Sequence, residues 1–317
     1  MHIPCAHLFQ IPKTILNMSL QPRIPLLVLM AAMAVMGMVS CSDTDDDDIL
    51  RQSSVKNDNR NDTSKEPALA RLEFPKVKGG TSRVVIHSLS DEFGINYSVE
   101  WDTNKKSQRW SCYQQYKANS VNRTSRYTST TNQYPFDPDL PSGLYFNGDP
   151  FWGSGYDHGH ICPSADRLYS KEANMQTFYL TNMQPQRNAF NANLWADMES
   201  FVRSRANSQQ CDTLYICKGG TIDKADQVML TLANGLLVPK YFYMALLMKN
   251  SAGYKAMAFW VEHTNQNLKG DDLGKYVISV RELEQLTDID FFCNLPDDVE
   301  EPVETLAVEN IKRAWGL

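Results

Sequence analysis

The sequence lacks three features: an apolar run of membrane-spanning length, an excess of positive charge, and a high content of histidine. The run from Leu26 to Val39 is uncharged and apolar, but it is shorter than the ~20 residues that a membrane-spanning helix needs. The formal net charge of −6 argues against a generally basic nucleic-acid-binding surface, although it leaves room for local basic patches. Because the chain has six histidines in 317 residues, two of them close together indicate a candidate site.

The first 41 residues have the pattern of an export signal. The apolar run follows Arg23 and ends at Ser40 and Cys41, and its length is typical of a signal-peptide core. Met38-Val39-Ser40-Cys41 resembles a bacterial lipobox, in which the cysteine is lipidated and becomes the first residue of the mature chain. This resemblance predicts a lipid anchor at Cys41 and a place in the outer membrane or on the cell surface. A plain signal would instead make the protein periplasmic or secreted.

A polar, acidic segment follows at residues 42–67. It includes the four aspartates Asp45 to Asp48 and few aromatic or branched apolar side chains. Such a segment cannot bury enough apolar surface to become ordered, so we expect a disordered tether ahead of a body at residues 68–317. The body holds five cysteines, and an odd number leaves at least one unpaired in an exported chain. They are Cys112, Cys162, Cys211, Cys217 and Cys293.

The body alternates short strand-like runs with a few helices. Runs rich in aromatic and β-branched residues predict strands at residues 97–101, 110–113, 177–180, 213–216, 241–248 and 256–261. Apolar residues at helical spacing predict a helix at 188–206, a capping box predicts one from Ser279, and a third is expected at 304–315. This mixture favours an α+β domain with a mainly antiparallel sheet. Residues 117–150 have the composition of a long surface loop, and such loops are often functional.

One short segment gathers most of the side chains that carry chemistry. It reads Tyr156-Asp157-His158-Gly159-His160, followed by Ile161-Cys162-Pro163-Ser164-Ala165-Asp166-Arg167. Two imidazoles, two carboxylates and a guanidinium thus surround one glycine. Histidine is the side chain best able to take a proton near neutral pH, so the segment predicts a site and not part of the core.

Two blocks of sequence together resemble the ββα-metal, or His-Me finger, site of the DNA/RNA non-specific endonuclease family. The family pattern Asp-Arg-Gly-His is met by Asp157-His158-Gly159-His160. Its second block is met by Phe178-Tyr179-Leu180-Thr181-Asn182-Met183-Gln184-Pro185-Gln186, and then by Asn191, Trp195 and Glu199 at the family spacing. The likeness covers most of the chain after about residue 95. It implies a strand-loop-strand-helix unit and an endonuclease that hydrolyses DNA and RNA with little sequence preference.

The resemblance also implies a role for each residue. His160 would be the general base, with Asp157 and His158 beside it in the catalytic group, although the Asp157 side chain could instead only fix the turn. Asn191 would bind Mg²⁺ directly, which suits a hard ion that prefers oxygen ligands, and Mn²⁺ could replace it. Glu199 would hold metal-bound water. Arg203, one helical turn after Glu199, would contact substrate phosphate, and Trp195 is expected to pack in the core.

This chain departs from the family at His158, where the family has arginine. A neutral imidazole brings less positive charge to the scissile phosphate than a guanidinium does. Another arginine is therefore expected to compensate, and the sequence leaves Arg123, Arg126 and Arg167 open.

Two other functions fit parts of the pattern. In a zinc hydrolase, His158, His160 and either Cys162 or Asp166 would bind the metal, but a full ligand set at familiar spacing is lacking. Alternatively, the protein could be an inactive surface lipoprotein that binds nucleic acid. The joint presence of the motif's histidine, asparagine and glutamate argues against such a loss of activity.

Overall fold

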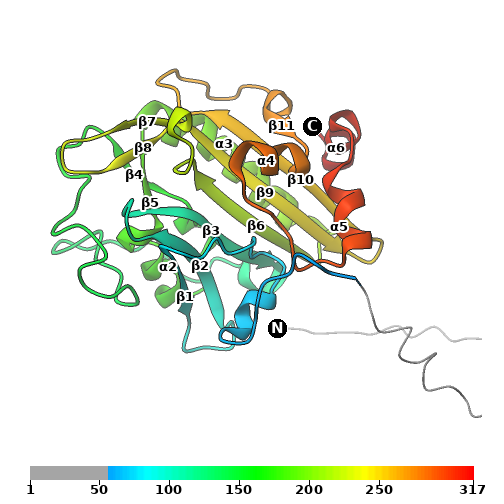
Figure 1. The fold of residues 1–317 in the computed structure, drawn as a ribbon, viewed down its shortest axis with the longest axis horizontal. Helices are drawn as coiled ribbons and strands as arrows, with labels where there is room; N and C mark the ends of the chain where they lie inside the picture. The colour runs from blue at the N-terminus through cyan, green and yellow to red at the C-terminus, as the bar shows by residue number, and fades with distance from the viewer. Residues whose placement is uncertain (1–55) are drawn as a thin grey trace, which may run out of the picture. The chain divides into compact units, whose positions relative to one another are not determined.

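The structure, a computed structural model, describes residues 56–317. Its centre is a sheet in the order β1-β2-β3-β6-β9-β10-β11, in which all neighbours are antiparallel (Figure 1). Its strands are β1 (Ser82–Ser88), β2 (Ile95–Asp102), β3 (Ser107–Tyr116), β6 (Thr213–Gly220), β9 (Tyr241–Asn250), β10 (Gly253–Glu262) and β11 (Val277–Ile278). Two smaller sheets pair β4 (Asp157–His160) with β5 (Met183–Gln186) and β7 (Val228–Thr231) with β8 (Leu237–Pro239). The predicted α+β class with a mainly antiparallel sheet is confirmed.

Helices cover both faces of the large sheet. They are α2 (Lys171–Gln176), α3 (Ala196–Ala206), α4 (Val280–Thr287), α5 (Asp297–Glu304) and α6 (Val308–Trp315). Side chains alternate across a strand, so Leu214 and Ile216 of β6 join the cluster under α3, whereas Tyr215 and Cys217 join the cluster under α4. Because both faces are covered, the central strands are buried at nearly every position, and β9 is also apolar along most of its length. This is why the predicted runs in β2, β3, β6, β9 and β10 are found as strands.

The run at residues 177–180 is not a strand, contrary to the prediction. It follows α2 as a series of tight turns, in which Phe178 N donates to Met175 O and Tyr179 N to Gln176 O. A 3-10 turn at Leu180–Asn182 then leads into β5. The aromatic content that predicted a strand instead reflects burial, since Phe178 has no exposed area.

The helix predictions hold with changed boundaries. The helix expected at 188–206 begins as a π-helical segment, Phe190–Trp195, and continues as α3. Ser279 caps α4 as predicted, its side chain accepting from Glu282 N. The helix predicted at 304–315 is found as α6, but it starts only at Val308: Glu304 belongs to the end of α5, and Ala307 is extended between the two helices. The sequence analysis did not predict α5. Its first turn is acidic, which is favourable at a helix N-terminus.

The ordered body begins earlier than predicted. Asn57 Nδ2 donates to Leu295 O at 2.6 Å, and Asn61, 4% exposed, donates from its Nδ2 to Pro75 O. The predicted tether therefore does not extend to residue 67. The signal segment and Cys41 lie outside the described residues. Among residues 56–317, no helix has the length and apolar character needed to span a bilayer.

The structure agrees with two further predictions, that of a long loop before the histidine motif and that of at least one unpaired cysteine. After a 3-10 turn at Lys117–Asn119, the described chain has no helix or strand until β4. All five cysteines of residues 56–317 are free. Cys112 and Cys217 lie opposite each other on β3 and β6.

Candidate active site

The histidine motif forms one strand of the small β4–β5 sheet. Asp157 pairs with Gln186 and His160 with Met183. At Gly159, an added Cβ would lie 2.3 Å from Gln186 Cδ, so this position accepts no larger side chain. The β4 strand, the connecting loop, β5 and the helix that starts at Phe190 make the predicted strand-loop-strand-helix unit.

Asn182 fixes the loop that connects the two strands. Its Oδ1 accepts from Cys162 N at 2.8 Å, and its Nδ2 donates to Cys162 O and Thr177 O, also at 2.8 Å. Asn182 and Cys162 have no exposed area. A buried amide with these partners stabilises the backbone on both sides of the loop. Cys162 is thereby a structural residue below the site.

An open pocket of about 500 Å³ lies against this unit. The long loop, β4, the connecting loop and the helix all contribute side chains to it. Its lining residues are Arg126, Tyr134, Tyr156, Asp157, His158, His160, Pro163, Ser164, Ala165, Asn191, Ala196 and Glu199. Five predicted site residues and one of the candidate arginines therefore meet in one place.

Asp157 orients the side chain of Asn191. Asn191 Nδ2 donates to Asp157 Oδ2 at 3.0 Å, and Asn188 Nδ2 donates to the same oxygen at 3.0 Å. The amide nitrogen of Asn191 is thus committed, while its Oδ1 has no hydrogen bond among residues 56–317. An amide oxygen at the pocket wall is a suitable ligand for Mg²⁺. The donor set therefore fits the predicted metal.

Glu199 and Trp195 lie on the same helix but have different surroundings. Trp195 is 1% exposed and packs against Phe242, as predicted for a core residue. Glu199 lines the pocket and accepts from the buried Lys218 Nζ at 2.8 Å. Burial raises the pKa of Glu199, and the charge of Lys218 opposes that rise. The π-helical start shifts the register, and such segments are frequent at functional sites.

The imidazole of His160 is neutral near neutral pH. Burial, followed by the nearby charge of Arg126, lowers the pKa of His160 to about 3. Its ring packs edge-on against Phe178 at 4.8 Å, and its Nε2 has no hydrogen-bond partner within the described chain. Because His160 lines the pocket, its neutral ring is placed to accept a proton there.

His158 is held by other side chains of the loop. It stacks on Tyr134 with ring centroids 3.7 Å apart and on Phe151 at 4.5 Å. Its Nε2 lies 2.8 Å from Asp149 Oδ2. Burial raises the pKa of Asp149, but the hydrogen bonds with His158 and with Phe151 N outweigh it and leave this pKa below its usual value. His158 thus has a carboxylate partner already.

The structure separates the three predicted phosphate-binding arginines. Arg126 lines the pocket, with its guanidinium 4.7 Å above the Phe178 ring that also contacts His160. Arg167 has no exposed area and donates to Asp166 O and Gln114 O, so it does not reach the pocket. Arg203 donates to Asp166 Oδ1 at 2.9 Å and lines an adjoining pocket. Of these three arginines, Arg126 is the one that lines the pocket together with His160.

The ligand set of the zinc alternative does not assemble. The Asp166 carboxylate already accepts hydrogen bonds from Arg203 Nη1 and from the hydroxyl of Tyr113. Within the described residues, the one group of His, Cys, Asp and Glu atoms close enough together to hold a metal ion is His87, Asp137 and Asp139. The sequence analysis did not identify this group, because His87 is separated from the aspartates by about 50 residues and only the fold joins them.

Sequence reasoning also missed several contributors to the pocket. Tyr134 and Asp149 support His158 from within the long loop, and Lys218 reaches Glu199 from β6. The expectation that the loop is functional was the available signal for the first two. A buried lysine in a strand gave no sequence signal, since its partner is known only from the fold.

Comparisons with known proteins agree with this geometry. A family model described as DNA/RNA non-specific endonuclease matches residues 83–298. A nuclease from Nostoc sp. is 30% identical over 221 residues, which cover 66% of this chain and 75% of that protein. The mitochondrial nuclease EXOG of Xenopus laevis is 24% identical over 64% of this chain and 58% of its own length. In fold, the chain is similar to one in a crystal structure of an EndoG/EndoGI complex, with a TM-score of 0.57, 19% identity, and coverage of 70% and 91% of the two chains.

Proposed function

Because the chain belongs to the DNA/RNA non-specific endonuclease family, we propose that it is a metal-dependent endonuclease that hydrolyses DNA and RNA with little sequence preference. The observation that carries this proposal is the meeting of His160, Asn191, Glu199 and Arg126 around one open pocket. Phosphodiester hydrolysis needs a base for the attacking water and positive charge for the phosphoryl oxygens. The pocket offers both.

His160 acts as the general base. Its low pKa keeps it neutral from mildly acidic pH upward, so it is ready to take a proton from water. A phosphate in the pocket adds negative charge close to the ring, which raises the pKa of His160 toward the range in which a base is most effective.

Asn191 Oδ1 is the protein ligand proposed for Mg²⁺, and Glu199 would hold water bound to it. When bound, the ion would stabilise negative charge on the phosphoryl and leaving oxygens. Asp157 keeps the Asn191 oxygen turned into the pocket by holding its Nδ2. Lys218 holds the Glu199 carboxylate in place.

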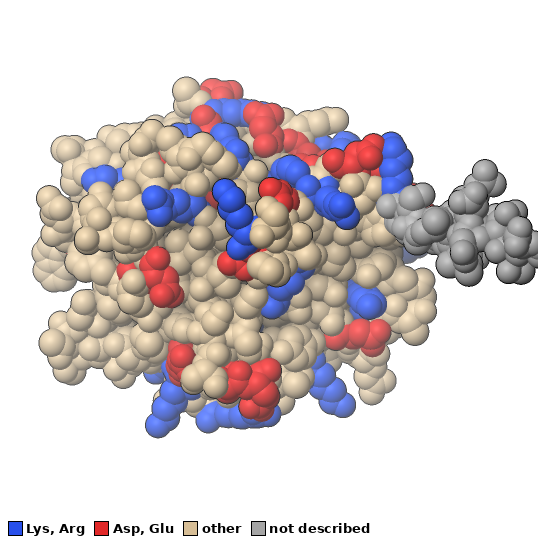
Figure 2. All heavy atoms as spheres, turned by 60° about the horizontal axis from the view of Figure 1, so that its bottom comes forward, with Lys and Arg blue, Asp and Glu red and all other residues tan. Residues whose placement is uncertain are grey.

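Arg126 supplies the positive charge that the motif lacks. Its place beside His160 and Phe178 supports a contact with the scissile phosphate. The position of Arg203 in the adjoining pocket supports a contact with a phosphate further along the strand. Figure 2 shows positive and negative side chains interspersed over the face in view. The net charge of −6 and the position of Arg126 in the pocket support attraction of the substrate by local arginines.

The export signal completes the proposal. The apolar run at Leu26 to Val39 and the lipobox-like Met38-Val39-Ser40-Cys41 support an exported protein that is attached to a membrane by lipid on Cys41. An enzyme in that place would meet nucleic acid from outside the cell or in the periplasm. Replacing Cys41 with Ser is expected to release the protein from the membrane fraction or to block its maturation.

A plasmid-nicking assay tests the catalytic proposal. The full chain should convert supercoiled plasmid to open circles with Mg²⁺, and EDTA should stop the reaction. The same preparation should degrade a single-stranded RNA of mixed sequence. Activity with Zn²⁺ but not Mg²⁺ would favour the zinc hydrolase, and binding without cleavage under every condition would show an inactive member of the family.

A further inference from the structure

The loop between Arg126 and the histidine motif is rich in aromatic residues and has no basic ones. Eight of the 30 residues from 127 to 156 are Phe, Trp or Tyr, whereas these residues make up 10% of the whole chain. None of the 30 is Lys or Arg. In nucleic-acid-binding proteins, aromatic side chains contact the flat faces of bases, whereas basic side chains contact phosphates. This composition therefore favours a contact with bases.

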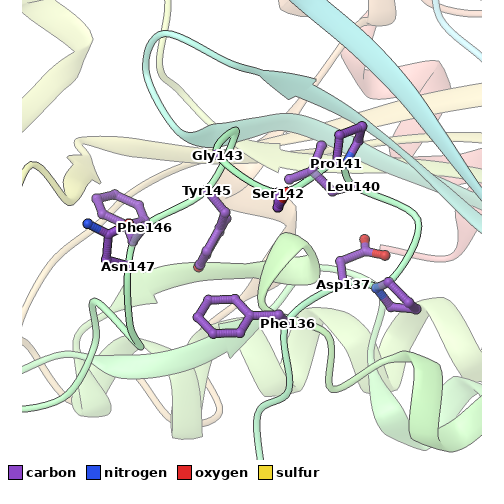
Figure 3. Close-up of a pocket in the computed structure, with 10 residues that line it drawn as sticks. Phe136, Asp137, Leu140, Pro141, Ser142, Gly143, Tyr145, Phe146 and Asn147 are labelled. Carbon is purple, nitrogen blue, oxygen red and sulfur yellow. The ribbon is translucent and has the colours of Figure 1, made fainter.

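Part of this loop surrounds an open cavity of about 470 Å³ (Figure 3). Its volume lies in the ~300–1,000 Å³ range of small-molecule sites. Phe136 and Tyr145 form one side of it, with ring centroids 5.6 Å apart and planes at 75°. Phe136 is 49% exposed, which is unusual for so large an apolar side chain. The cavity thus offers aromatic surface to a planar ligand.

The wall formed by Tyr145 is fixed before any ligand binds. Tyr145 packs on Trp101 with centroids 5.2 Å apart, and Trp101 Nε1 donates to Leu144 O at 3.0 Å. The Asp137 carboxylate, on the opposite side, is held by His87 at 3.2 Å and by the Thr181 hydroxyl. A preformed site loses little entropy on binding.

A free cation lies at the edge of the cavity. Lys106 Nζ is 5.3 Å from the ring centroid of Phe146, which lines the cavity. Of the ion pairs within residues 56–317, none includes Lys106. A nucleotide has a base that can contact the aromatic walls and a phosphate that can contact the Lys106 ammonium, so the cavity and Lys106 together fit a nucleotide.

The cavity and the catalytic pocket border the same apolar cluster. Tyr134, which lines the catalytic pocket, packs against the same buried residues as Tyr145 and Phe146. These shared residues are Phe151, Leu180, Met183 and Leu236. A substrate strand bound in the catalytic pocket would have to cross this cluster to reach the cavity.

We propose that the cavity binds one unpaired nucleobase of the substrate strand and that Lys106 contacts a phosphate next to it. This inference rests on the proposed function and adds a preference to it. A base in a duplex is paired and stacked, and it must leave the stack to enter such a cavity. The subsite therefore favours single strands, duplex ends and distorted duplexes. Since every base has an aromatic face, it adds no sequence preference.

Equilibrium binding separates this subsite from catalysis. The probes are a fluorescein-labelled 12-mer of thymidylate and a 12-mer of abasic spacer with the same phosphates, measured by fluorescence anisotropy with the full chain in EDTA. Phe136→Ala should weaken binding of the thymidylate probe by about tenfold, within the range for loss of one stacked base. Binding of the abasic probe should not change. Phe136→Tyr should restore the wild-type ratio.

Two further variants serve as controls. Val121 is as exposed as Phe136, at 49%, but does not line the cavity, so Val121→Ala should bind both probes like wild type. Lys106→Gln should weaken both probes equally, since it removes a phosphate contact. Equal loss for both probes in Phe136→Ala, or no loss, overturns the proposal. Because no cleavage is needed, an inactive enzyme would contradict the proposed function without affecting this test.

Discussion

The surroundings of His160, which is partly buried, and of His87, which is fully buried, have opposite effects on the two imidazoles. At His160, burial and the charge of Arg126 both favour the neutral ring, and the pKa falls to about 3. At His87, burial also lowers the pKa, but the nearby carboxylates of Asp137 and Asp139 outweigh it and leave the pKa above its ordinary value. Burial is thus common to both, and the neighbouring charges decide which form is stable.

Because their pKa values are shifted in opposite directions, we propose different roles for the imidazoles of His160 and His87. A neutral His160 can accept a proton, as a base must. His87 lies 3.2 Å from a carboxylate oxygen at each ring nitrogen, so in its charged form it holds both aspartates to β1. These aspartates belong to the loop that supports His158 and surrounds the apolar cavity. We propose that His160 acts on the substrate, whereas His87 links the loop to β1.

Exchanging the two histidines for alanine should separate activity from stability. His160→Ala should lower the cleavage rate by at least ~100-fold, the usual contribution of acid-base catalysis, and leave the thermal unfolding temperature nearly unchanged. His87→Ala should instead lower the free energy of unfolding by about 3 kcal/mol, because two carboxylates lose their buried partner. Initial rates on supercoiled plasmid and thermal unfolding of both variants test this. Near-normal cleavage by folded His160→Ala would contradict its role as base.

Arg126→Ala should remove both the phosphate contact and a cause of the low pKa of His160. We expect an activity loss of about 100-fold, as for other groups that stabilise transition-state charge, and a rise in the pKa of His160. Activity is measured on plasmid, and the pKa by NMR titration of the ring. Arg123→Ala is the matched control, since its guanidinium stacks on Phe93 outside the pocket. Equal losses in both variants would show a general effect of surface charge.

Asn191→Ala should raise the Mg²⁺ concentration needed for half-maximal rate by on the order of 10- to 100-fold. Asn188→Ala is the control, because Asn188 donates to the same Asp157 oxygen and does not line the pocket. Glu199→Ala should have an intermediate effect. Mn²⁺ binding, followed by electron paramagnetic resonance, gives a second measurement that does not depend on cleavage. If Asn191→Ala and Asn188→Ala respond alike to Mg²⁺, the helix does not carry the metal ligand.

The histidine comparison also shows what the sequence could and could not predict. The motif at Asp157 to His160 and the helix with Asn191 were identified from local patterns, since strand pairing and helix spacing bring neighbouring blocks together. Asp157 was identified only as a member of the catalytic group, whereas the structure shows that it orients Asn191. The choice between Arg126 and Arg167 could not be made, because it depends on which guanidinium the fold buries. Local propensity likewise failed at residues 177–180, where tertiary contacts favour turns.

His87→Gln should change how stability depends on pH. A raised folded-state pKa contributes stability that is fully present below the unfolded pKa of ~6.5 and is lost as pH rises through the folded value. The variant should therefore be less stable than wild type at pH 5.5, and the difference should be smaller at pH 9. His160→Gln should show the opposite slope, because a lowered pKa costs stability as pH falls. Urea unfolding at both pH values measures this, and parallel slopes would refute the comparison.

His158 is the intermediate case, since it faces the catalytic pocket yet pairs with a carboxylate as His87 does. A guanidinium is planar, stacks on aromatic rings and pairs with carboxylates. His158→Arg should therefore keep the stack on Tyr134 and the contact with Asp149, and change the cleavage rate by less than about threefold. The new charge would be neutralised by Asp149 and would not reach the phosphate.

A sharper test removes the carboxylate that would neutralise the guanidinium of His158→Arg. In the double variant His158→Arg with Asp149→Asn, the guanidinium loses its carboxylate partner and becomes free to contact the substrate, at the position where the family has its arginine. Adding both changes to Arg126→Ala should recover about tenfold of the lost rate, the value of one good charge-assisted contact, whereas His158→Arg alone should recover little. Recovery would show that Arg126 does the work of the missing motif arginine. If His158→Arg is folded but inactive, an imidazole is required at residue 158, and its role is not to substitute for arginine.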